Sequence, residues 1–301
     1  MHPARFSMPS TLRELTIEDQ NQVNLLCQTV WEGNDYVPES FPKWVEDPLA
    51  TTLGIFEENE LVCMSNLELV SGTSIAWVQG LRVKDGFRHK GYGIRITDAI
   101  VQRARENRVR ILWYATSSQN EASQRVAEKT GFHKADSVGY FRLYSPYPNH
   151  PKPSSSIVPL KASSERLFEL VSLNPDLIPS TTLPMAWEFD FKSLEGLKRL
   201  EKHTEFKVVI DEAGLAQALY CKVDRRRKDE LTAAYTVFST DRAIFVDIMS
   251  RILDEVITSK ADRAVFFLGP GPTEWALSLG YVDQEFIGRR FLLYEKNPVE
   301  F

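Results

Sequence analysis

The chain has 301 residues, of which 43% are hydrophobic and 26% are charged, and its formal net charge is −5. These values are typical of a globular protein that forms one large domain or two ordinary ones. The negative charge argues against nucleic acid as the main partner, because binding to phosphates requires a basic face.

The cysteines and the hydrophobic pattern indicate the compartment. Three scattered cysteines without metal-ligand spacing favour a reducing environment and no bound metal. No stretch approaches the ~18 apolar residues of a membrane span, and the first twenty residues lack the apolar core of a signal peptide. We therefore expect a cytoplasmic protein without a membrane partner.

The N-terminal part alternates short apolar runs with helical patterns. Strands are predicted at residues 11–16, 52–56 and 61–70, and a helix at 18–30. Residues 31–48 are rich in aromatic side chains, Gly, Asn, Asp and Pro. This composition predicts a loop.

The most informative stretch is a strand followed by a glycine-containing turn. Residues 75–83 are apolar and β-branched, which predicts a strand, and a helical pattern begins after Gly93. The turn at residues 88–93 reads R-H-K-G-Y-G, and two glycines allow positive φ and a close approach to a ligand. Amides at a helix N-terminus bind anions, so the turn predicts a pyrophosphate site. Its residues are Arg88, His89, Lys90, Gly91, Tyr92, Gly93 and Ile94.

A second motif follows the strand predicted at residues 110–115. Residues 120–132 read N-E-A-S-Q-R-V-A-E-K-T-G-F, which predicts a helix that begins after Asn120 and stops at Gly131. A closing strand is predicted at residues 139–144.

The remainder of the chain repeats this pattern after a proline- and serine-rich segment. Residues 145–164 are predicted to form a semi-rigid linker. Beyond it, strand and helix patterns recur with an offset of roughly 150 residues. The turn at residues 239–243 has lost its glycines, and its Asp241 would repel a pyrophosphate. Residues 269–272, G-P-G-P, stand where the Asn motif would recur and are predicted to form a turn.

The order strand, R-x-x-G-x-G, helix, strand, N-x-x-S, helix, Gly-Phe resembles the GNAT family of N-acetyltransferases. The residues that match are Arg88, Gly91, Gly93 and Asn120. The resemblance implies an α/β (α+β) fold of two tandem GNAT-like domains, each a mixed, mostly antiparallel sheet flanked by helices. We expect these domains at residues 1–147 and 165–301, joined by a linker at 148–164.

The same resemblance implies that acetyl-CoA is the acyl donor. In the family, the R-x-x-G-x-G amides hold its pyrophosphate, and the later Asn contacts the pantetheine region, a role that Asn120 would take. Backbone groups of Leu81, Arg82 and Val83 would also face the pantetheine. A strand splayed beyond Val83 would leave room for the thioester, and an N–H near Leu81 would polarise its carbonyl.

The acceptor side resembles the histidine N-acetyltransferases within this family. The resemblance rests on residues 33–38 (G-N-D-Y-V-P), 44–48 (W-V-E-D-P) and 80–83 (G-L-R-V). It implies a small amine acceptor, such as a free amino acid like histidine, bound by Asp35 and Tyr36. A carboxylate among aromatic side chains also suits a cationic acceptor.

Two positions depart from the family pattern. Many members carry a Tyr general acid where this chain has Ala127, and a Glu where it has Gln79. Gln cannot accept a proton at pH 7 and can only orient a water or the acceptor. Glu68 on the preceding strand is then the nearest candidate base. The general acid stays open among Tyr92, Tyr140 and a water.

The sequence thus predicts an acetyl-CoA-dependent N-acetyltransferase for a small amine. Because both proton-transfer positions differ, two alternatives stay open: an acetyl-CoA-binding regulatory module without turnover, and a peptide or protein N-acetyltransferase. The second domain, which has lost the glycine turn, is predicted to be structural or to shape the substrate site. The internal repeat is compatible with a monomer, and a homodimer stays open.

Overall fold

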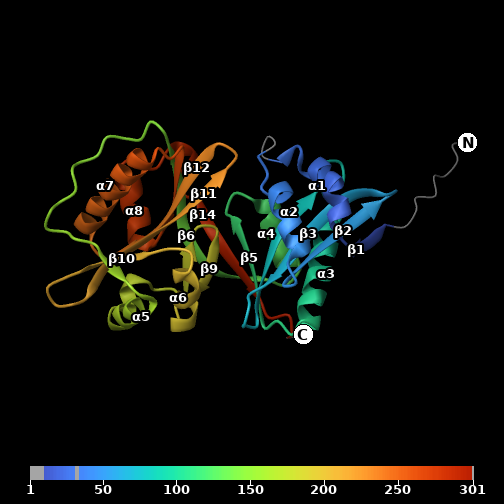
Figure 1. Ribbon diagram of the computed structural model, residues 1–301, viewed down its shortest axis with the longest axis horizontal. Coiled ribbons are helices and arrows are strands. Elements are labelled where there is room, and N and C mark those ends of the chain that lie inside the picture. Colours follow the sequence, from blue (N-terminus) through green and yellow to red (C-terminus); the bar gives the residue numbers. More distant parts are fainter. Residues whose placement is uncertain (1–9, 31–33, 300–301) are drawn as a thin grey trace, which may run out of the picture. The chain divides into compact units, whose positions relative to one another are not determined.

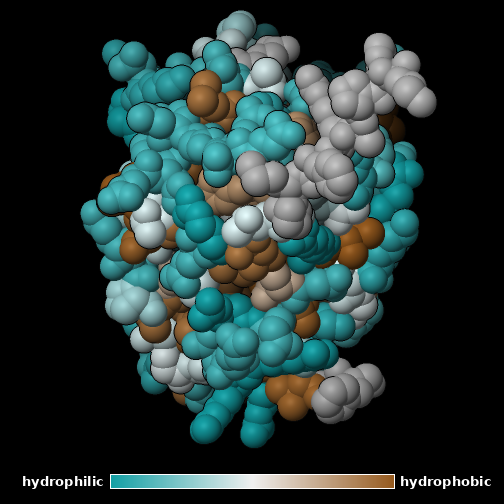
Figure 2. All heavy atoms as spheres, turned by 90° about the vertical axis from the view of Figure 1, so that its right-hand side faces the viewer, coloured by the Kyte–Doolittle hydropathy of each residue, from teal (hydrophilic) through white to brown (hydrophobic). Residues whose placement is uncertain are grey.

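The computed structural model describes residues 10–30 and 34–299, and its elements are labelled in Figure 1. These residues form two units. Unit 1 contains the described residues up to Thr116, Asn120–Ala135 and those from Leu293 onward, and unit 2 contains Ser117–Gln119 and Asp136–Leu292. No described helix is long and apolar enough to span a membrane. The face shown in Figure 2 is mostly hydrophilic around a smaller apolar area.

Unit 1 is built on strands in the order β1-β2-β3-β4-β5, with β14 beside β5. The pairs from β1 to β4 are antiparallel, and β4 and β5 are parallel. The strands are β1 (Thr11–Glu14), β2 (Ala50–Glu57), β3 (Glu60–Leu69), β4 (Ile75–Val83), β5 (Ile111–Ser117) and β14 (Arg290–Lys296).

Helices cover both faces of the sheet in unit 1 (Figure 1). On one face, α1 (Gln20–Cys27) and α2 (Val37–Glu46) bury a core that includes Phe41 and Met64. On the other face lie α3 (Tyr92–Glu106) and α4 (Glu121–Lys129). A 3-10 turn, Ile17–Asp19, leads into α1.

Part of the segment predicted as a loop is the helix α2. Its apolar residues Val37, Phe41 and Trp44 are spaced by four and three positions, so they fall on one buried face. Pro38 stands in the first turn, where the missing N–H costs no intrahelical bond. Pro38 therefore marks the start of a helix, which the loop-like composition of the segment concealed.

Unit 2 repeats the pattern of unit 1. Its strands lie in the order β6-β13-β12-β11-β10-β7, and only β12 and β13 are parallel. A separate hairpin consists of β8 and β9. The strands are β6 (His133–Tyr144), β7 (Leu160–Ala162), β8 (Thr182–Met185), β9 (Glu188–Phe191), β10 (Phe206–Ile210), β11 (Ala216–Arg227), β12 (Glu230–Ser239) and β13 (Arg263–Leu268). The helices are α5 (Ser164–Leu173), α6 (Leu194–Glu201), α7 (Arg242–Ser259) and α8 (Pro270–Ser278), with 3-10 turns at Pro175–Leu177 and Gln284–Phe286.

The two units do not coincide with the two halves of the sequence. The strand predicted to close the N-terminal domain is part of β6, which belongs to unit 2 from Asp136 onward and pairs with β13. There Phe141 lies opposite Phe266, and their rings stack with centroids 4.5 Å apart. Conversely, β14 belongs to unit 1 from Leu293 onward. A strand pattern shows that a segment is extended but not which strand it pairs with, so the predicted boundary at residue 147 differs from the observed one.

Two further segments differ from the prediction. The linker predicted at residues 148–164 ends in β7, which pairs with β10, and its middle is hydrogen-bonded to α7. The G-P-G-P segment begins α8, with Gly269 as the N-cap and Pro270 in the first turn. Proline suits that position because its φ is already helical.

Candidate functional site

The turn before α3 has the backbone form of an anion site. His89 and Gly91 have positive φ values of 62° and 87°. Gly91 is the N-cap of α3, and no side chain caps the helix there. The first helical bond runs from the N–H of Arg95 to the carbonyl of Gly91, at 3.0 Å. The preceding amides, those of Tyr92, Gly93 and Ile94, therefore have no acceptor within the helix and can bind an anion.

The two glycines of the turn have different functions. Both were predicted to take positive φ, but α3 begins at Tyr92, so Gly93 is already helical. A Cβ at Gly93 would lie 3.2 Å from the Cγ2 of Val126 and 3.7 Å from that of Val83. Gly93 therefore permits close packing of α3 on α4 and β4, whereas Gly91 shapes the turn.

The side chains around this turn have defined partners. Arg88 forms an ion pair of 3.1 Å with Asp85, and both side chains are exposed. The Nζ of Lys90 lies 4.9 Å from the ring centroid of Phe87. The hydroxyl of Tyr92 donates to Glu57, and this hydrogen bond raises the pKa of Tyr92. Tyr92, one of the candidate general acids, is therefore held by a carboxylate.

The corresponding helix of unit 2 is capped differently. Asp241 is the N-cap of α7, and its carboxylate accepts a hydrogen bond of 2.9 Å from the N–H of Ile244. This carboxylate occupies a position that a phosphate would need. The geometry is consistent with a phosphate site in unit 1 and none at α7.

Next to the turn, β4 is paired with β5 over only part of its length. The parallel register joins Ile75–Val78 to Ile111–Tyr114, although β4 continues to Val83. The pairing of β4 with β3 is irregular near Gly80, whose φ is 66°. The strands thus part after Val78, earlier than the predicted position beyond Val83. Leu81, Arg82 and Val83 lie on the part of β4 that β5 does not pair with.

Glu68 and Gln79, the two predicted catalytic side chains of this unit, lie next to each other on β3 and β4. The amide Nε2 of Gln79 donates a hydrogen bond to Oε2 of Glu68. Both residues are half-buried. Gln79 was predicted to orient a water or the acceptor, and the structure shows that it orients the Glu68 carboxylate.

A buried amide lies beside this pair. Asn66 stands opposite Gln79 in the register of β3 and β4 and is fully buried. Its Oδ1 accepts a hydrogen bond of 2.8 Å from Thr52, but its Nδ2 has no partner among the described residues. Buried donors are normally paired, so a water or a ligand atom would satisfy it. Asn66 could not be recognised as a site residue from the sequence, because it sits within an ordinary strand pattern.

Asp35, predicted to bind the acceptor, is buried in an ion pair. Its oxygens accept hydrogen bonds from Nε and Nη2 of Arg82 at 2.5 and 2.6 Å, and from the N–H of Val37 at 3.1 Å. The side chain of Asp35 is 1% exposed and that of Arg82 is 12% exposed. The charge of Asp35 is therefore satisfied by a cation of the protein. Contrary to the prediction, Asp35 does not present its charge to an acceptor; it positions the segment before α2 on β4.

Tyr36 remains close to the irregular part of β4. Its hydroxyl accepts a hydrogen bond of 3.3 Å from the N–H of Gly80, and its ring lies 5.4 Å from the guanidinium carbon of Arg82. Burial raises the pKa of Tyr36, so the hydroxyl is neutral. Gly33 of the same motif lies outside the described residues.

A pair of hydroxyls lies where β4 and β5 part. Asn120 caps α4, and its Oδ1 accepts a hydrogen bond of 3.2 Å from the N–H of Ser123. The Oγ of Ser123 lies 2.5 Å from the hydroxyl of Tyr114, whose pKa burial raises to about 12. Ser123 is one helical turn before Ala127 and shares its face of α4. Tyr114 and Ser123 are thus a second source of hydroxyls, which the apolar pattern around Tyr114 concealed.

Tyr140, the third predicted catalytic residue, belongs to unit 2. It is buried among Phe267, Phe286 and Phe291, with ring centroids 5.4 to 6.4 Å apart. Its hydroxyl accepts a hydrogen bond of 2.7 Å from Nε of Arg142. This environment accounts for Tyr140 as a core residue of unit 2, and its catalytic assignment stays a prediction.

Known proteins resemble this chain at two levels: a family model matches part of the sequence, and solved structures share the fold. Residues 17–132 match the model of the Acetyltransferase (GNAT) family. A search of curated proteins finds no match. Among solved structures, the chain is similar to a tandem GNAT protein from the clavulanic acid biosynthesis pathway, with a TM-score of 0.59, 12% identity, and coverage of 97% of this chain and 100% of the other. It is also similar to a GCN5-related N-acetyltransferase from Sphaerobacter thermophilus, with a TM-score of 0.61, 12% identity and coverage of 96% of both chains.

At such low sequence identities the structural matches show only a similar fold, and that similarity extends over both units. The family match covers the uncapped turn, β4 and the Asn120 helix. Among the described residues, no group of His, Cys, Asp and Glu side chains is arranged to hold a metal ion. Residues 17–132 are thus similar to the acetyltransferase (GNAT) family, and the fold of the two units is similar to that of a tandem GNAT protein.

Proposed function

We propose that the chain is an acetyl-CoA-dependent N-acetyltransferase that acts on the amine of a small molecule. The observation that carries the proposal is the N-terminus of α3, which begins at a glycine with positive φ and has no side-chain cap. In the chain, this turn follows the part of β4 that does not pair with β5. The turn offers amides to a pyrophosphate, and the unpaired backbone offers a second set of amides and carbonyls to an extended chain.

The residues of unit 1 can each be given a role. Bound acetyl-CoA supplies an acetyl thioester, which an amine attacks. Glu68, held by Gln79, takes the proton that the amine must lose. A backbone N–H near Leu81 stabilises the charge that develops on the carbonyl oxygen. The Tyr114 and Ser123 hydroxyls, or a water that they hold, return a proton to the departing thiolate.

The acceptor that we propose is a free amino acid, with histidine as the first candidate. Support comes from the 34–38 and 80–83 sequence motifs, which the structure joins through the Asp35–Arg82 ion pair and the Tyr36–Gly80 hydrogen bond. Tyr36 is half-buried and lies beside Gly80 and Arg82. A neutral hydroxyl and an aromatic ring suit an acceptor that carries both an amine and a planar group.

A thiol-release assay tests this function. Acetyl-CoA would be incubated with the protein and a panel of free amino acids, polyamines and short peptides, histidine included. We expect turnover with one class of small amine. Turnover only with peptides would support a peptide acetyltransferase instead, and binding of acetyl-CoA without any turnover would support a regulatory binding module.

The cofactor site can be tested separately at Gly91. Replacing it with Val should lower acetyl-CoA affinity about tenfold or more, because a β-branched residue resists positive φ at a cost of roughly 1–3 kcal/mol. Among the described residues other than its two chain neighbours, no atom lies within 4 Å of a Cβ at Gly91, so the loss would come from the turn changing shape and not from a clash. Calorimetric titration with acetyl-CoA measures the effect.

Gly72→Val is the matched control. Gly72 also has positive φ, at 73°, and also has no atom within 4 Å of an added Cβ, but it lies in the turn between β3 and β4. It should carry the same strain and keep its affinity for acetyl-CoA. Equal losses in both variants would mean that the effect reflects strain alone, and unchanged affinity in Gly91→Val would remove the assignment of the turn to the cofactor.

A further inference from the structure

Unit 2 contains a groove that takes no part in the site described above. It has a volume of about 440 Å³ and lies between β10, β11, α7 and the segment that precedes β7. This volume is in the range of small-molecule sites. The groove is lined by Lys207, Tyr220, Arg251, Asp254 and Glu255, together with Pro153, Val158 and Pro159.

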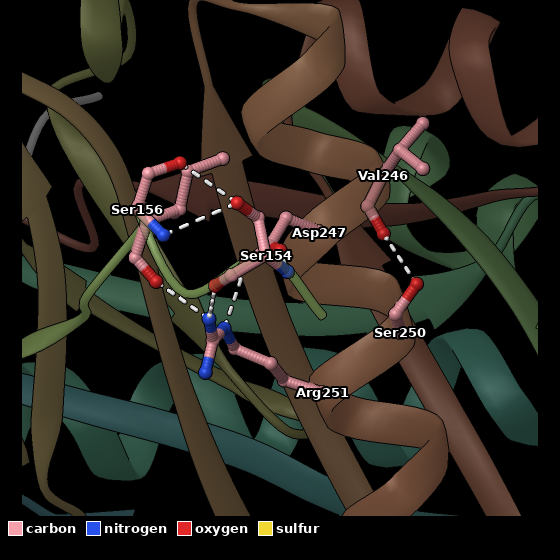
Figure 3. Close-up of polar contacts among 7 residues, drawn as sticks. Ser154, Ser156, Val246, Asp247, Ser250 and Arg251 are labelled. Carbon is pink, nitrogen blue, oxygen red and sulfur yellow. Dashed lines mark hydrogen bonds and ion pairs between the residues drawn. The ribbon is translucent and has the colours of Figure 1, made fainter. Parts of the chain in front are cut away.

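One wall of the groove is a chain segment fastened to α7, as Figure 3 shows. The carboxylate of Asp247 accepts hydrogen bonds from the N–H of Ser154 and from Nε of Arg251. Nη2 of Arg251 donates to the carbonyls of Ser154 and Ile157, both at 2.5 Å. The position of this wall therefore depends on Arg251, which also lines the groove.

The carboxylates of the groove already have partners. Oε1 of Glu255 lies 2.8 Å from Nζ of Lys222. Oδ1 of Asp254 accepts a hydrogen bond of 2.9 Å from Nε2 of His150. These two acidic residues are therefore engaged on the protein side, and their charge disfavours a dianionic ligand such as a phosphate.

The hydrogen-bond donors that line the groove can still donate to a ligand. Within the described part of the chain, Nη1 of Arg251 makes no hydrogen bond, and in Figure 3 no dashed line reaches that nitrogen. Nζ of Lys207 is 4.0 Å from Glu255, which is a weak contact, and lies 5.3 Å from the ring centroid of Tyr220. Burial, followed by the charge of Glu255, raises the pKa of Tyr220 to about 12, so its hydroxyl is a donor at neutral pH.

We propose that this groove binds a small monocarboxylate with an apolar body. The carboxylate accepts hydrogen bonds from Lys207, Tyr220 and Arg251, and the apolar body lies against the two prolines and Val158. Ionised acceptors form the strongest hydrogen bonds with such donors. Because Arg251 also holds Ser154 and Ile157, an occupant of the groove would stabilise this segment on α7.

Fluorine NMR of the full chain with para-fluorobenzoate tests the proposal. We expect saturable binding of this carboxylate, and no binding of para-fluorobenzamide, which has the same shape without the charge. Lys207→Met and Tyr220→Phe should each weaken binding about tenfold, since each removes a hydrogen bond to a charged group. Circular dichroism would establish that both variants are folded.

Two controls locate the probe. Lys198→Met removes an exposed lysine of the same unit, which pairs with Glu165 at 3.0 Å, and should leave binding unchanged. Gly91→Val should also bind the probe normally, because the groove lies in the other unit. The proposal fails if para-fluorobenzoate does not bind, if the amide binds equally well, if Lys207→Met and Tyr220→Phe bind as the unaltered chain does, or if Gly91→Val loses binding.

Discussion

Replacing Glu68 with Gln should lower kcat by about 10²–10⁴-fold, which is the usual contribution of a positioned general base. The variant keeps the size of the side chain and a polar contact to Gln79, but it removes the proton acceptor. Acetyl-CoA affinity should be unchanged, because Glu68 lies on β3 and not on the turn before α3. The expected result is therefore a selective loss of turnover.

Steady-state kinetics with the acceptor found in the thiol-release panel would measure this loss, with calorimetry for acetyl-CoA binding. Glu60→Gln is the matched control, since Glu60 is a second glutamate of β3 that is exposed and pairs with Lys84. It should leave kcat within about twofold. If Glu68→Gln retained full kcat, the proton would have to leave through another group, and the Tyr114–Ser123 pair would be tested next.

A pH profile separates a base from a positioning residue. If Glu68 accepts the proton, the variant should lose the limb of the kcat/KM profile that reports ionisation of a carboxylate. A role limited to holding Gln79 would lower kcat without removing that limb. The Glu68–Gln79 hydrogen bond is compatible with both roles, general base and positioning residue. The pH profile therefore decides between them.

The glycine-containing turn before α3 could be predicted from the sequence because its determinants are local. A strand, a turn with Gly91 and an amphipathic helix are all encoded within residues 75–106, and the structure contains each of them. The start of α3 was misplaced by two residues because Gly93 was read as a turn residue. Gly93 has no side chain, and this allows α3 to pack closely against Val126 of α4. The local sequence does not reveal that contact.

Features that depend on distant residues could not be read in this way. The pairing of β6 with β13 joins residues more than a hundred positions apart, and nothing in the alternation of either strand specifies the other. Asp35 was predicted to meet a ligand because a carboxylate stood among aromatic residues. The same observation also suits a buried ion pair, and only the fold shows that Arg82 reaches it.

That ion pair leads to the second large effect. Asp35→Asn should lower the free energy of unfolding by about 3–5 kcal/mol, because it leaves the buried guanidinium of Arg82 without its counter-charge. Both side chains are largely withdrawn from water, so solvent cannot replace the lost partner. Urea denaturation followed by circular dichroism would measure the change.

Removing both charges should recover much of that loss. In Asp35→Leu/Arg82→Met, apolar side chains replace the pair and no unpaired charge remains, so stability should return toward that of the original chain. Arg125→Gln, which breaks an exposed pair with Glu121, is the surface control and should change stability by less than about 1 kcal/mol. A double variant as unstable as Asp35→Asn would show that the pair itself, and not the avoidance of a lone charge, stabilises unit 1. If the double variant is stable but inactive, the pair's contribution is to hold Tyr36 and Gly80 in register for catalysis.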